Sequence, residues 1–275
     1  LSYPSFFQHT DLTVGSKFLC VRVFITGGAN GIGRVTVEKL VDKGHKVIVF
    51  DKDGESLEDL PDSVKTYQGD VRNSERLEEV VRREIFGVLV NCAGFQEQGS
   101  VEDMPLEKFE DHFETNFFGS LKALKISLPM LKERNGRIIN VSSIAGKATI
   151  PFLGAYSSSK HALEGMTDSL RMEMRDENVE VVLVEPGPIK TGFNHQAEEA
   201  LRKYIPESDY TEKYRKRLES RNKGAKPEKA AKFIVKAVES SNPKTRYTVT
   251  LEAYLVRKLK PFIPTKMFDF IASRK

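Results

Sequence analysis

The fold follows from eight consecutive residues, Thr26-Gly27-Gly28-Ala29-Asn30-Gly31-Ile32-Gly33. An apolar run from Phe18 to Ile25 precedes them and predicts a buried strand, and apolar residues at helical spacing follow as far as Val41. A glycine-rich turn between a strand and a helix lets the backbone approach a pyrophosphate, while the helix start offers N–H groups that lack partners. The turn therefore predicts dinucleotide binding, with six contacting residues: Thr26, Gly27, Asn30, Gly31, Ile32 and Gly33.

A carboxylate stands at the end of the next expected strand, which runs from Lys46 to Phe50. Asp51 lies twenty residues after Gly31, where an acid accepts hydrogen bonds from the adenosine ribose. The same carboxylate repels a ribose phosphate, by about 4 kcal/mol for two charges about 4 Å apart at an effective dielectric of about 20. Lys52 acts in the opposite sense, because a cation there would hold the phosphate. On balance the sequence predicts NAD in preference to NADP.

Strand and helix patterns alternate along the rest of the chain with short links. The further strands are expected at Val64–Tyr67, Gly87–Val90, Gly136–Val141, Val179–Val184 and Arg246–Leu251. Helices are expected at 74–84, at 106–133, at 155–178 and from Pro227. This order is typical of a Rossmann-type, doubly wound α/β fold, with a seven-stranded parallel sheet and helices on both faces. We expect one catalytic domain over 17–275 after a tail at 1–16, with a helical substrate-binding insertion at 193–226 and a C-terminal extension at 251–275.

Tyr156 and Lys160 lie four residues apart on one face of an expected helix. A nearby ammonium group favours the phenolate, so it lowers the pKa of the phenol and creates a general acid/base for an alcohol proton. By itself this spacing is more often a plain surface pair. Ser143 supports the functional interpretation, because it follows an expected strand at the carboxyl end, where open parallel sheets bind ligands.

Composition excludes several classes of protein. The chain has 275 residues, of which 39% are hydrophobic and 30% charged, and no apolar run is long enough to span a bilayer. The first sixteen residues do not resemble a secretory signal, so we expect a cytoplasmic protein. Cys20 and Cys92 would lie about 20 Å apart on neighbouring strands, too far for a disulfide, and are expected to be buried free thiols. His9, His45 and His195 form no ligand pattern with either cysteine, so no metal is expected.

Charge is distributed unevenly along the chain. Residues 1–200 carry a net charge of −8, whereas residues 201–275 carry +12. The basic part is either a solvated or subunit-facing surface or a contact for an anionic partner. It contains no recognisable nucleic-acid module, so no nucleic-acid partner is expected. A peripheral contact of the basic, amphipathic C-terminal extension with a membrane surface stays open, as an alternative to a soluble enzyme.

With these residues laid out, the chain resembles the short-chain dehydrogenase/reductase family, in its single-domain branch, from about residue 18 to residue 250. The motifs agree in type, order and spacing: Thr26-Gly-x-x-x-Gly-Ile-Gly33, Asp70, Asn91-x-Ala-Gly94, Asn116, Ser143, Tyr156-x-x-x-Lys160 and Pro186-Gly-x-x-x-Thr191. The stretch from Asn140 to Gly165 is similar to the branch that contains retinol and 17β-hydroxysteroid dehydrogenases and their bacterial relatives. Cys92 departs from the family, which usually has a second asparagine there.

The resemblance implies a role for each matched residue. Tyr156 would transfer the hydroxyl proton, and Lys160 would lower the pKa of the phenol and hydrogen-bond the nicotinamide ribose. Ser143 would hold the substrate oxygen, and Asn116 would hold a water that links Lys160 to solvent. His112 and His161 lie near these residues in sequence but are expected to be structural. The remaining implied cofactor contacts are Asp51, Asp70, Val71, Asn91, Ala93, Gly94, Pro186, Gly187, Ile189 and Thr191.

The family implies an NAD(P)-dependent oxidoreductase acting on an alcohol or ketone, and a homodimer or homotetramer formed through the helices at 106–133 and 155–178. Its substrate would depend on residues 144–154 and 193–222. Five apolar side chains favour a bulky hydrophobic secondary alcohol or ketone, or a retinoid- or steroid-like compound: Ile144, Ile150, Phe152, Leu153 and Phe193. The basic region 201–232 also allows an anionic substrate such as an acyl thioester. The rival reading is a non-catalytic nucleotide-binding or membrane-surface interaction protein on the same fold.

Overall fold

The computed structural model describes residues 20–219 and 224–273, without the side chains of residues 193–196. The expected tail at 1–16 lies outside the described residues, as do Phe18 and Leu19 of the first expected strand. All strands of the sheet are parallel, in the order β3-β2-β1-β4-β5-β6-β7, which confirms the predicted fold class. Their bounds are β1 Arg22–Thr26, β2 Lys46–Asp51, β3 Lys65–Gln68, β4 Val88–Asn91, β5 Arg137–Val141, β6 Glu180–Glu185 and β7 Arg246–Thr248.

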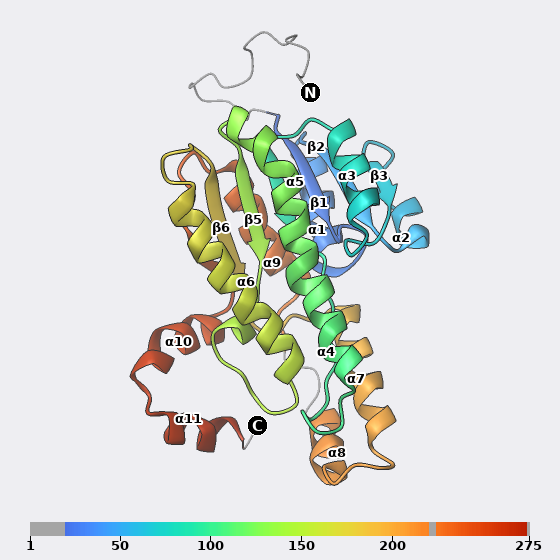
Figure 1. Cartoon of the computed structure of the whole chain (residues 1–275), viewed down its shortest axis with the longest axis vertical. Helices are drawn as coiled ribbons and strands as arrows, with labels where there is room; N and C mark the ends of the chain where they lie inside the picture. The colour runs from blue at the N-terminus through green and yellow to red at the C-terminus, as the bar shows by residue number, and fades with distance from the viewer. Residues whose placement is uncertain (1–19, 220–223, 274–275) are drawn as a thin grey trace.

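Helices cover both faces of this sheet (Figure 1). On one face α1 (Gly31–Asp42), α2 (Gly54–Glu58) and α9 (Pro227–Glu239) contribute to an apolar core, and on the other face α3 (Ser74–Arg83), α5 (Ser120–Glu133) and α6 (Gly154–Glu173) do so. Successive residues of β1 enter opposite cores: Val23 and Ile25 pack with α1 and α9, and Phe24 packs with α3 and α5. This explains why the strand is a continuous apolar run instead of an alternating one.

The helical stretch expected at 106–133 is interrupted by a wider turn. It consists of α4 (Leu106–Phe113), the π-helical turn η1 (Glu114–Gly119) and α5. Asn116, which the sequence had marked for function, lies within this π turn and is fully buried. Single π turns inside helices are often found at functional sites, so the irregularity singles out the same residue as the motif does.

Two elements end several residues before the position that the sequence predicts. Helix α6 ends at Glu173 instead of continuing to Asn178, whose φ of +54° is incompatible with a right-handed helix. Strand β7 ends at Thr248, and Leu251 belongs to the next helix, α10 (Leu251–Leu259). Thr250 starts that helix, because its side chain accepts a hydrogen bond from the backbone N–H of Ala253 at 3.1 Å.

Two helical segments flank the carboxyl ends of the strands (Figure 1). One comprises α7 (Gly192–Tyr204) and α8 (Thr211–Glu219), within the expected insertion. The other comprises α10, the short 3-10 helix η3 (Lys260–Phe262) and α11 (Thr265–Ala272). They lie on opposite sides of the lower part of the molecule in that view, so a ligand at the strand ends would lie between them. That these segments are a substrate-binding insertion and a C-terminal extension of one catalytic domain stays a prediction.

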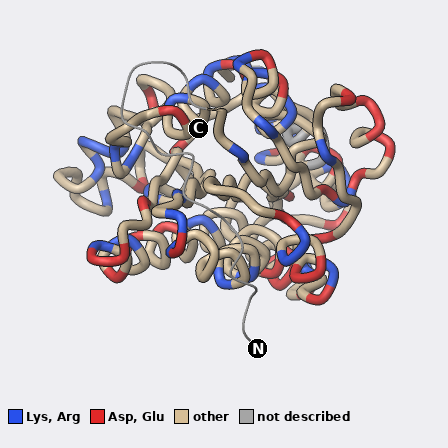
Figure 2. Tube along the Cα trace, turned by 90° about the horizontal axis from the view of Figure 1, so that it is seen from above, with Lys and Arg blue, Asp and Glu red and all other residues tan. Residues whose placement is uncertain are grey.

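Charged residues are spread around the periphery, and the centre of the trace is largely uncharged (Figure 2). Within the described residues, no helix combines the length and the apolar character needed to cross a bilayer. Both cysteines are free thiols, as expected. The prediction that both are buried is wrong for Cys20, which is exposed because it precedes β1 instead of lying inside it, and Cys92 is only partly buried.

Candidate active site

The turn between β1 and α1 is built from glycines that no other residue can replace. Gly27 has a φ of +72°, and a Cβ added to it would lie 2.5 Å from the Cα of Ala93. A Cβ on Gly33 would lie 1.9 Å from the carbonyl oxygen of Gly27. The side chain of Asn30 does not cap α1 but donates to the Asp53 carboxylate at 2.8 Å. The first N–H groups of α1 therefore have no side-chain acceptor from the N-cap residue, as an anion site requires.

Acidic side chains stand beside this turn. Asp51, at the end of β2, accepts hydrogen bonds from the backbone N–H groups of Ala29 at 2.9 Å and Asp53 at 3.1 Å. Asp70 follows β3 and is bonded by the guanidinium of Arg72 at 2.8 and 3.0 Å. Burial alone would raise the pKa of Asp70, but the hydrogen bonds from Arg72 hold it below its usual range. Both carboxylates are thus acceptors held in place by hydrogen bonds at the carboxyl ends of the strands.

A cavity of about 1390 Å³ extends along the carboxyl ends of the strands. Three of the twenty predicted site residues, Thr26, Asn91 and Asn116, do not line it, and the other seventeen do. Those seventeen are Gly27, Asn30, Gly31, Ile32, Gly33, Asp51, Asp70, Val71, Ala93, Gly94, Ser143, Tyr156, Lys160, Pro186, Gly187, Ile189 and Thr191. The fold therefore brings together residues that are up to 164 positions apart, between Gly27 and Thr191.

The three other residues support the cavity wall from behind. The buried Asn91 donates through Nδ2 to Asn140 Oδ1 at 2.9 Å, which links β4 to β5. Thr26 accepts from the backbone N–H of Ala93 at 3.4 Å. Asn116 donates to the carbonyl of Phe95 at 3.0 Å and to Ser159 Oγ at 3.1 Å, and its Oδ1 accepts from the N–H of Phe95 at 2.9 Å. Both polar atoms of the Asn116 side chain are engaged within the protein.

Ser143, Tyr156 and Lys160 meet on the cavity wall. Ser143 follows β5, and its hydroxyl is hydrogen-bonded to the Tyr156 phenol from α6. The Nζ of Lys160 lies 5.9 Å from the centroid of the Tyr156 ring and donates to the carbonyl of Val141 at 3.0 Å. Tyr156 is 6% and Lys160 5% exposed, although both side chains border the cavity. The geometry brings two hydroxyl groups and one ammonium group to one point.

Burial controls the protonation of this group. It raises the pKa of Tyr156 to about 12, and the hydrogen bond with Ser143 only partly opposes the rise. It lowers the pKa of Lys160 to about 8, against the attraction of Cys92 and Glu164. At neutral pH the phenol therefore carries its proton. The expected lowering of the phenol pKa by the lysine is not seen in this arrangement: burial dominates the pKa of Tyr156, and the lowering contribution comes from Ser143.

One end of the cavity is lined by apolar side chains from the segment after β5. Ile144, Ile150 and Leu153 face it as predicted. Phe152 does not: its ring packs against Tyr214 and Tyr210, with centroids 4.8 and 5.9 Å apart. The side chain of Phe193 lies outside the described residues. Three of the five predicted residues therefore line the cavity and one supports its wall, and their use as a pocket for an apolar substrate stays a prediction.

The sequence interpretation missed several lining residues. Gln98 accepts a hydrogen bond from Arg217 of α8 at 3.3 Å, and both side chains face the cavity. The C-terminal segment adds an apolar wall: Leu255, Val256, Leu259, Ile263, Phe268, Ile271 and Ala272. No periodicity or motif distinguishes these residues from ordinary surface helix positions. The apolar character of the tail was the sole available signal, and it could not show which residues face inward.

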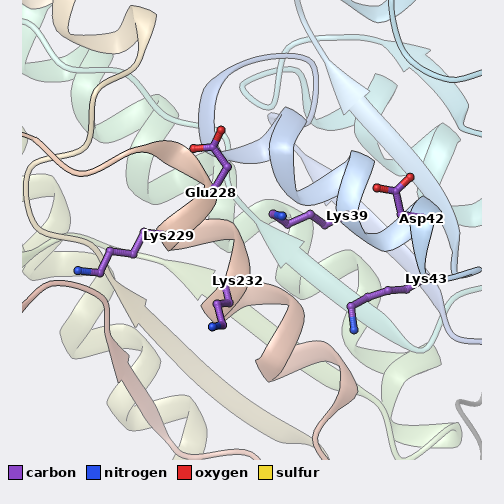
Figure 3. Close-up of a pocket in the computed structure, with 6 residues that line it drawn as sticks. All are labelled: Lys39, Asp42, Lys43, Glu228, Lys229 and Lys232. Carbon is purple, nitrogen blue, oxygen red and sulfur yellow. The ribbon is translucent and has the colours of Figure 1, made fainter.

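The remaining histidines and the second hollow do not resemble a reactive site. The buried His112 accepts from the N–H of Glu97 at 3.0 Å and bonds the carbonyl of Lys108, so both ring nitrogens are used. Burial also lowers its pKa, which keeps the ring neutral. The described residues contain no group of three or more potential metal ligands. A smaller hollow of about 560 Å³ lies between α1 and α9 (Figure 3) and includes no predicted site residue; it is lined by Lys39, Asp42, Lys43, Glu228, Lys229 and Lys232.

Comparisons with known proteins show which proteins this chain is similar to. The family model described as short chain dehydrogenase matches residues 22–202. A 3-ketodihydrosphingosine reductase of Bacteroides thetaiotaomicron is 34% identical, over 90% of this chain and 95% of that protein. An NADPH-dependent 3-dehydrocapnine reductase of Ornithobacterium rhinotracheale is also 34% identical, over 90% of this chain and 94% of its own length.

Solved structures support the fold. A short chain dehydrogenase of Burkholderia cenocepacia, in complex with NADP, superimposes with a TM-score of 0.73 at 24% identity, covering 88% of this chain and 93% of that one. The family model covers well over half of the chain, and the two reductases match it nearly end to end. The chain therefore belongs to the short-chain dehydrogenase/reductase family, and it is an NAD(P)-dependent oxidoreductase that acts on alcohol or ketone groups.

Proposed function

We propose that this enzyme interconverts a hydrophobic ketone and its secondary alcohol, with Tyr156 as the general acid/base. The observation that carries the proposal is the hydrogen bond between Ser143 and Tyr156 at the junction of two unlike parts of one cavity. One part has the glycine turn and fixed carboxylates, and the other has apolar walls. A substrate oxygen at the two hydroxyls would be held between a nucleotide-binding surface and an apolar surface.

The nicotinamide dinucleotide fits the first part. A cradle without side chains at Gly27 and Gly33, next to the N-terminus of α1, suits a pyrophosphate, and Asp51 is an acceptor for ribose hydroxyls. When bound, this group supplies the hydride chemistry. The protein residues that would hold it include Asp70 and Val71 toward the adenine side and Ile189 and Thr191 toward the nicotinamide side.

Tyr156 and Ser143 would both contact the substrate oxygen, with a different role for each. The phenol, protonated at neutral pH, donates its proton to the oxygen of a ketone as that atom becomes an alkoxide. The Ser143 hydroxyl donates a second hydrogen bond to the same atom and stabilises its developing charge. In the reverse direction Tyr156 accepts the alcohol proton. The two hydroxyls therefore need to be close together before substrate binds, as their hydrogen bond requires.

Lys160 and Asn116 would act by position. Lys160 is held at 3.0 Å by the carbonyl of Val141, one turn of α6 from Tyr156. Its ammonium group is within reach of a ribose hydroxyl in the same cavity, and a charged lysine stabilises the phenolate that forms when Tyr156 gives up its proton. Asn116 fixes Phe95 and Ser159 on the two sides of the π turn, and so supports the wall next to Lys160.

We propose NAD as the preferred dinucleotide. Asp51 is placed by two backbone N–H groups, so it cannot move away from a ribose phosphate without losing both bonds. Lys52, which also faces the cavity, offers the opposing attraction. The 3-dehydrocapnine reductase is named for NADPH, and the Burkholderia structure contains NADP, so the choice depends on which of these two neighbouring side chains dominates.

The substrate we propose is a long, mainly apolar ketone with a polar group at one end. Apolar side chains from two segments line the substrate part, and Gln98 and Arg217 provide a polar spot on it. Both reductases that match this chain carry names of 3-keto or 3-dehydro compounds. An anionic end, such as that of an acyl thioester, would bond Arg217. We also keep the homodimer or homotetramer, formed through α4–α5 and α6, as a prediction.

A substrate screen tests this proposal. A panel of steroid, retinoid, sugar and long-chain keto compounds would be followed by nicotinamide absorbance with NADH and NADPH, using wild type and Tyr156→Phe. We expect turnover of apolar ketones and none of sugars. Tyr156→Phe should reduce the rate by about 10²- to 10⁴-fold or more, because it removes the proton donor and leaves the cavity shape. An unchanged rate in this variant would defeat the proposed role of Tyr156.

A further inference from the structure

Exposed apolar side chains are concentrated at the C-terminal end of the chain. Among the described residues, thirteen large hydrophobic side chains are exposed, and eight of them lie in α10, η3 and α11. We call these eight the C-terminal apolar face: Leu251, Tyr254, Leu255, Leu259, Phe262, Met267, Phe270 and Ile271. Phe262 is 85% and Leu251 71% exposed. A patch this concentrated is typical of an interaction surface.

The segment that carries this face is fixed to the body of the protein. Ala253 is fully buried, and Lys260 donates to the carbonyl of Lys147, four residues after Ser143. Arg257 approaches the buried carboxylate of Glu185 at 3.8 Å. These contacts hold one side of α10 and η3, so the opposite side keeps its apolar residues outward. The exposure is therefore set by the fold of the segment.

The apolar face is continuous with the cavity. Leu255, Leu259 and Ile271 are each about half exposed, and each also lines the cavity. Phe268 and Ile263, between them in sequence, face inward. Figure 1 shows α10 and α11 beside the lower end of the molecule, across from α7 and α8. An apolar molecule could pass from the outer face to the catalytic hydroxyls along apolar side chains.

Basic residues outnumber acidic ones in the segment that carries the face. Residues 251–275 contain six basic and two acidic side chains, and Lys258 and Lys266 are exposed among the apolar residues. A second copy of the chain on a two-fold axis would bring these like charges together, at a cost to the complex. An anionic lipid surface meets both features at once, because apolar side chains enter the acyl boundary and cations bond the headgroups.

We propose that the C-terminal apolar face docks on an anionic lipid bilayer and sets the cavity mouth against it. The part of this proposal that concerns the substrate rests on the proposed function, because an apolar ketone dissolved in the bilayer would reach Tyr156 without crossing water. The docking itself does not depend on the reaction. The occupant of the face is the lipid surface, and the segment is a peripheral contact that does not cross it.

Vesicle sedimentation of the full chain tests the docking. The vesicles are of phosphatidylcholine alone or of phosphatidylcholine with phosphatidylserine. The test variant is Phe262→Asp with Met267→Asp, since both side chains are exposed and neither lines the cavity. The matched control is Val101→Asp, which changes a similarly exposed apolar residue, 73% exposed, that lies before α4 and does not line the cavity. We expect wild type and control to bind the anionic vesicles, and the double variant to bind at least about tenfold more weakly.

The outcomes separate docking from catalysis. Turnover of a water-soluble ketone should be equal in all three proteins, whereas turnover of a vesicle-dissolved ketone should fall in the double variant alone. Failure of wild type to sediment, or equal sedimentation of the double variant, overturns the docking. So does conversion of a wild-type oligomer to monomers by the double substitution in light scattering, because the face is then a subunit interface. Sedimentation without turnover of any ketone retains the docking and rejects the proposed function.

Discussion

Lys160 donates a hydrogen bond from Nζ to the backbone carbonyl of Val141 at 3.0 Å, which joins α6 to the end of β5 behind the Tyr156 ring. Both partners are buried. The bond holds an ammonium group where water is largely excluded, and this burial lowers the pKa of Lys160 to about 8. A charged group that is buried in this way lowers the free energy of unfolding, and this loss can be measured.

The first prediction concerns Lys160→Met. The folded pKa of about 8 lies below the value of 10.5 for an exposed lysine, so the unfolded chain binds more protons between these pH values, and stability rises with pH across this window. Below pH 8 the wild type bears the full penalty. Methionine removes this penalty but also loses the hydrogen bond to Val141. The free energy of unfolding of the variant should therefore be about 1 kcal/mol higher than that of the wild type at pH 7.

Urea unfolding of both proteins between pH 7 and pH 10.5 checks this. The gain of Lys160→Met should shrink as the pH rises from about 8 toward 10.5, because folding of the wild type then releases the Lys160 proton, and this release costs less as the pH rises toward the pKa of the unfolded chain. A difference that stays constant over this range would contradict the buried-charge explanation. The variant should also lose turnover, which shows that the penalty is retained for function.

The second prediction is a pH dependence of turnover that differs between the two directions. Tyr156, with a pKa near 12, is protonated at neutral pH, so ketone reduction has its proton donor throughout pH 6 to 9. Alcohol oxidation needs the phenolate, whose fraction rises about tenfold per pH unit below the pKa. Stopped-flow absorbance in both directions checks this. Oxidation that is independent of pH from 6 to 9 would mean that another group accepts the proton.

Local patterns predicted the catalytic group because its geometry is set by short-range rules. The glycine turn follows from the steric needs of Gly27 and Gly33, and the approach of Tyr156 and Lys160 follows from one helical turn. The π turn at Asn116 could not be predicted, since it depends on bonds to Phe95 and Ser159 on other segments.

The residues that form the cavity walls could also not be predicted from the sequence. Arg217 meets Gln98 across 119 residues, and the tail folds back over the site by way of Lys260 and Lys147. Phe152 has the apolar character of a pocket residue but packs instead on Tyr210 and Tyr214. Which apolar residues face a cavity is decided by tertiary packing between distant segments, and a single sequence carries no measure of that packing.

The third prediction concerns cofactor choice. Asp51→Ala removes the carboxylate that accepts from ribose hydroxyls and repels a ribose phosphate, so kcat/KM for NADH should fall and that for NADPH should rise. We expect the ratio to move by about tenfold to a hundredfold, because each partner contributes about 1.5 to 3 kcal/mol. Lys52→Ala should move the ratio in the opposite sense. If both variants shift it in the same direction, Asp51 and Lys52 do not oppose each other as proposed.

The fourth prediction concerns the ion pairs behind α6. Arg246 of β7 pairs with the buried Glu164 and Glu185 at 2.5 Å and also with Asp168. Burial alone would lower the pKa of Arg246, but its carboxylate partners raise it. Arg246→Met leaves the buried Glu164 with Lys147, at 2.9 Å, and the buried Glu185 with Arg257, at 3.8 Å, as their remaining cations, which should lower the free energy of unfolding by up to about 3 to 5 kcal/mol.

An exposed ion pair provides the control for that measurement. Arg82 pairs with Glu78 at 2.5 Å on the surface of α3, with side chains 59% and 45% exposed. Arg82→Met should change stability by less than about 1 kcal/mol. Equal losses of stability in the two variants, measured by urea unfolding, would show that burial does not make the Arg246 ion pairs more important for stability than an exposed pair.

The fifth prediction compares two glycine-to-alanine substitutions. Gly165 lies in α6 with nothing within 4 Å of an added Cβ, so Gly165→Ala should stabilise the protein by about 0.5 to 1 kcal/mol through helix propensity. Gly33→Ala would place its Cβ 1.9 Å from the carbonyl of Gly27, which forces the turn open. The dissociation constant for NADH, measured by fluorescence titration, should rise about tenfold or more, which corresponds to a loss of about 1.4 kcal/mol or more of binding free energy. Tight NADH binding by a folded Gly33→Ala protein would place the dinucleotide away from this turn, and the proposed positions of Asp51, Lys160 and Tyr156 around it would have to be abandoned.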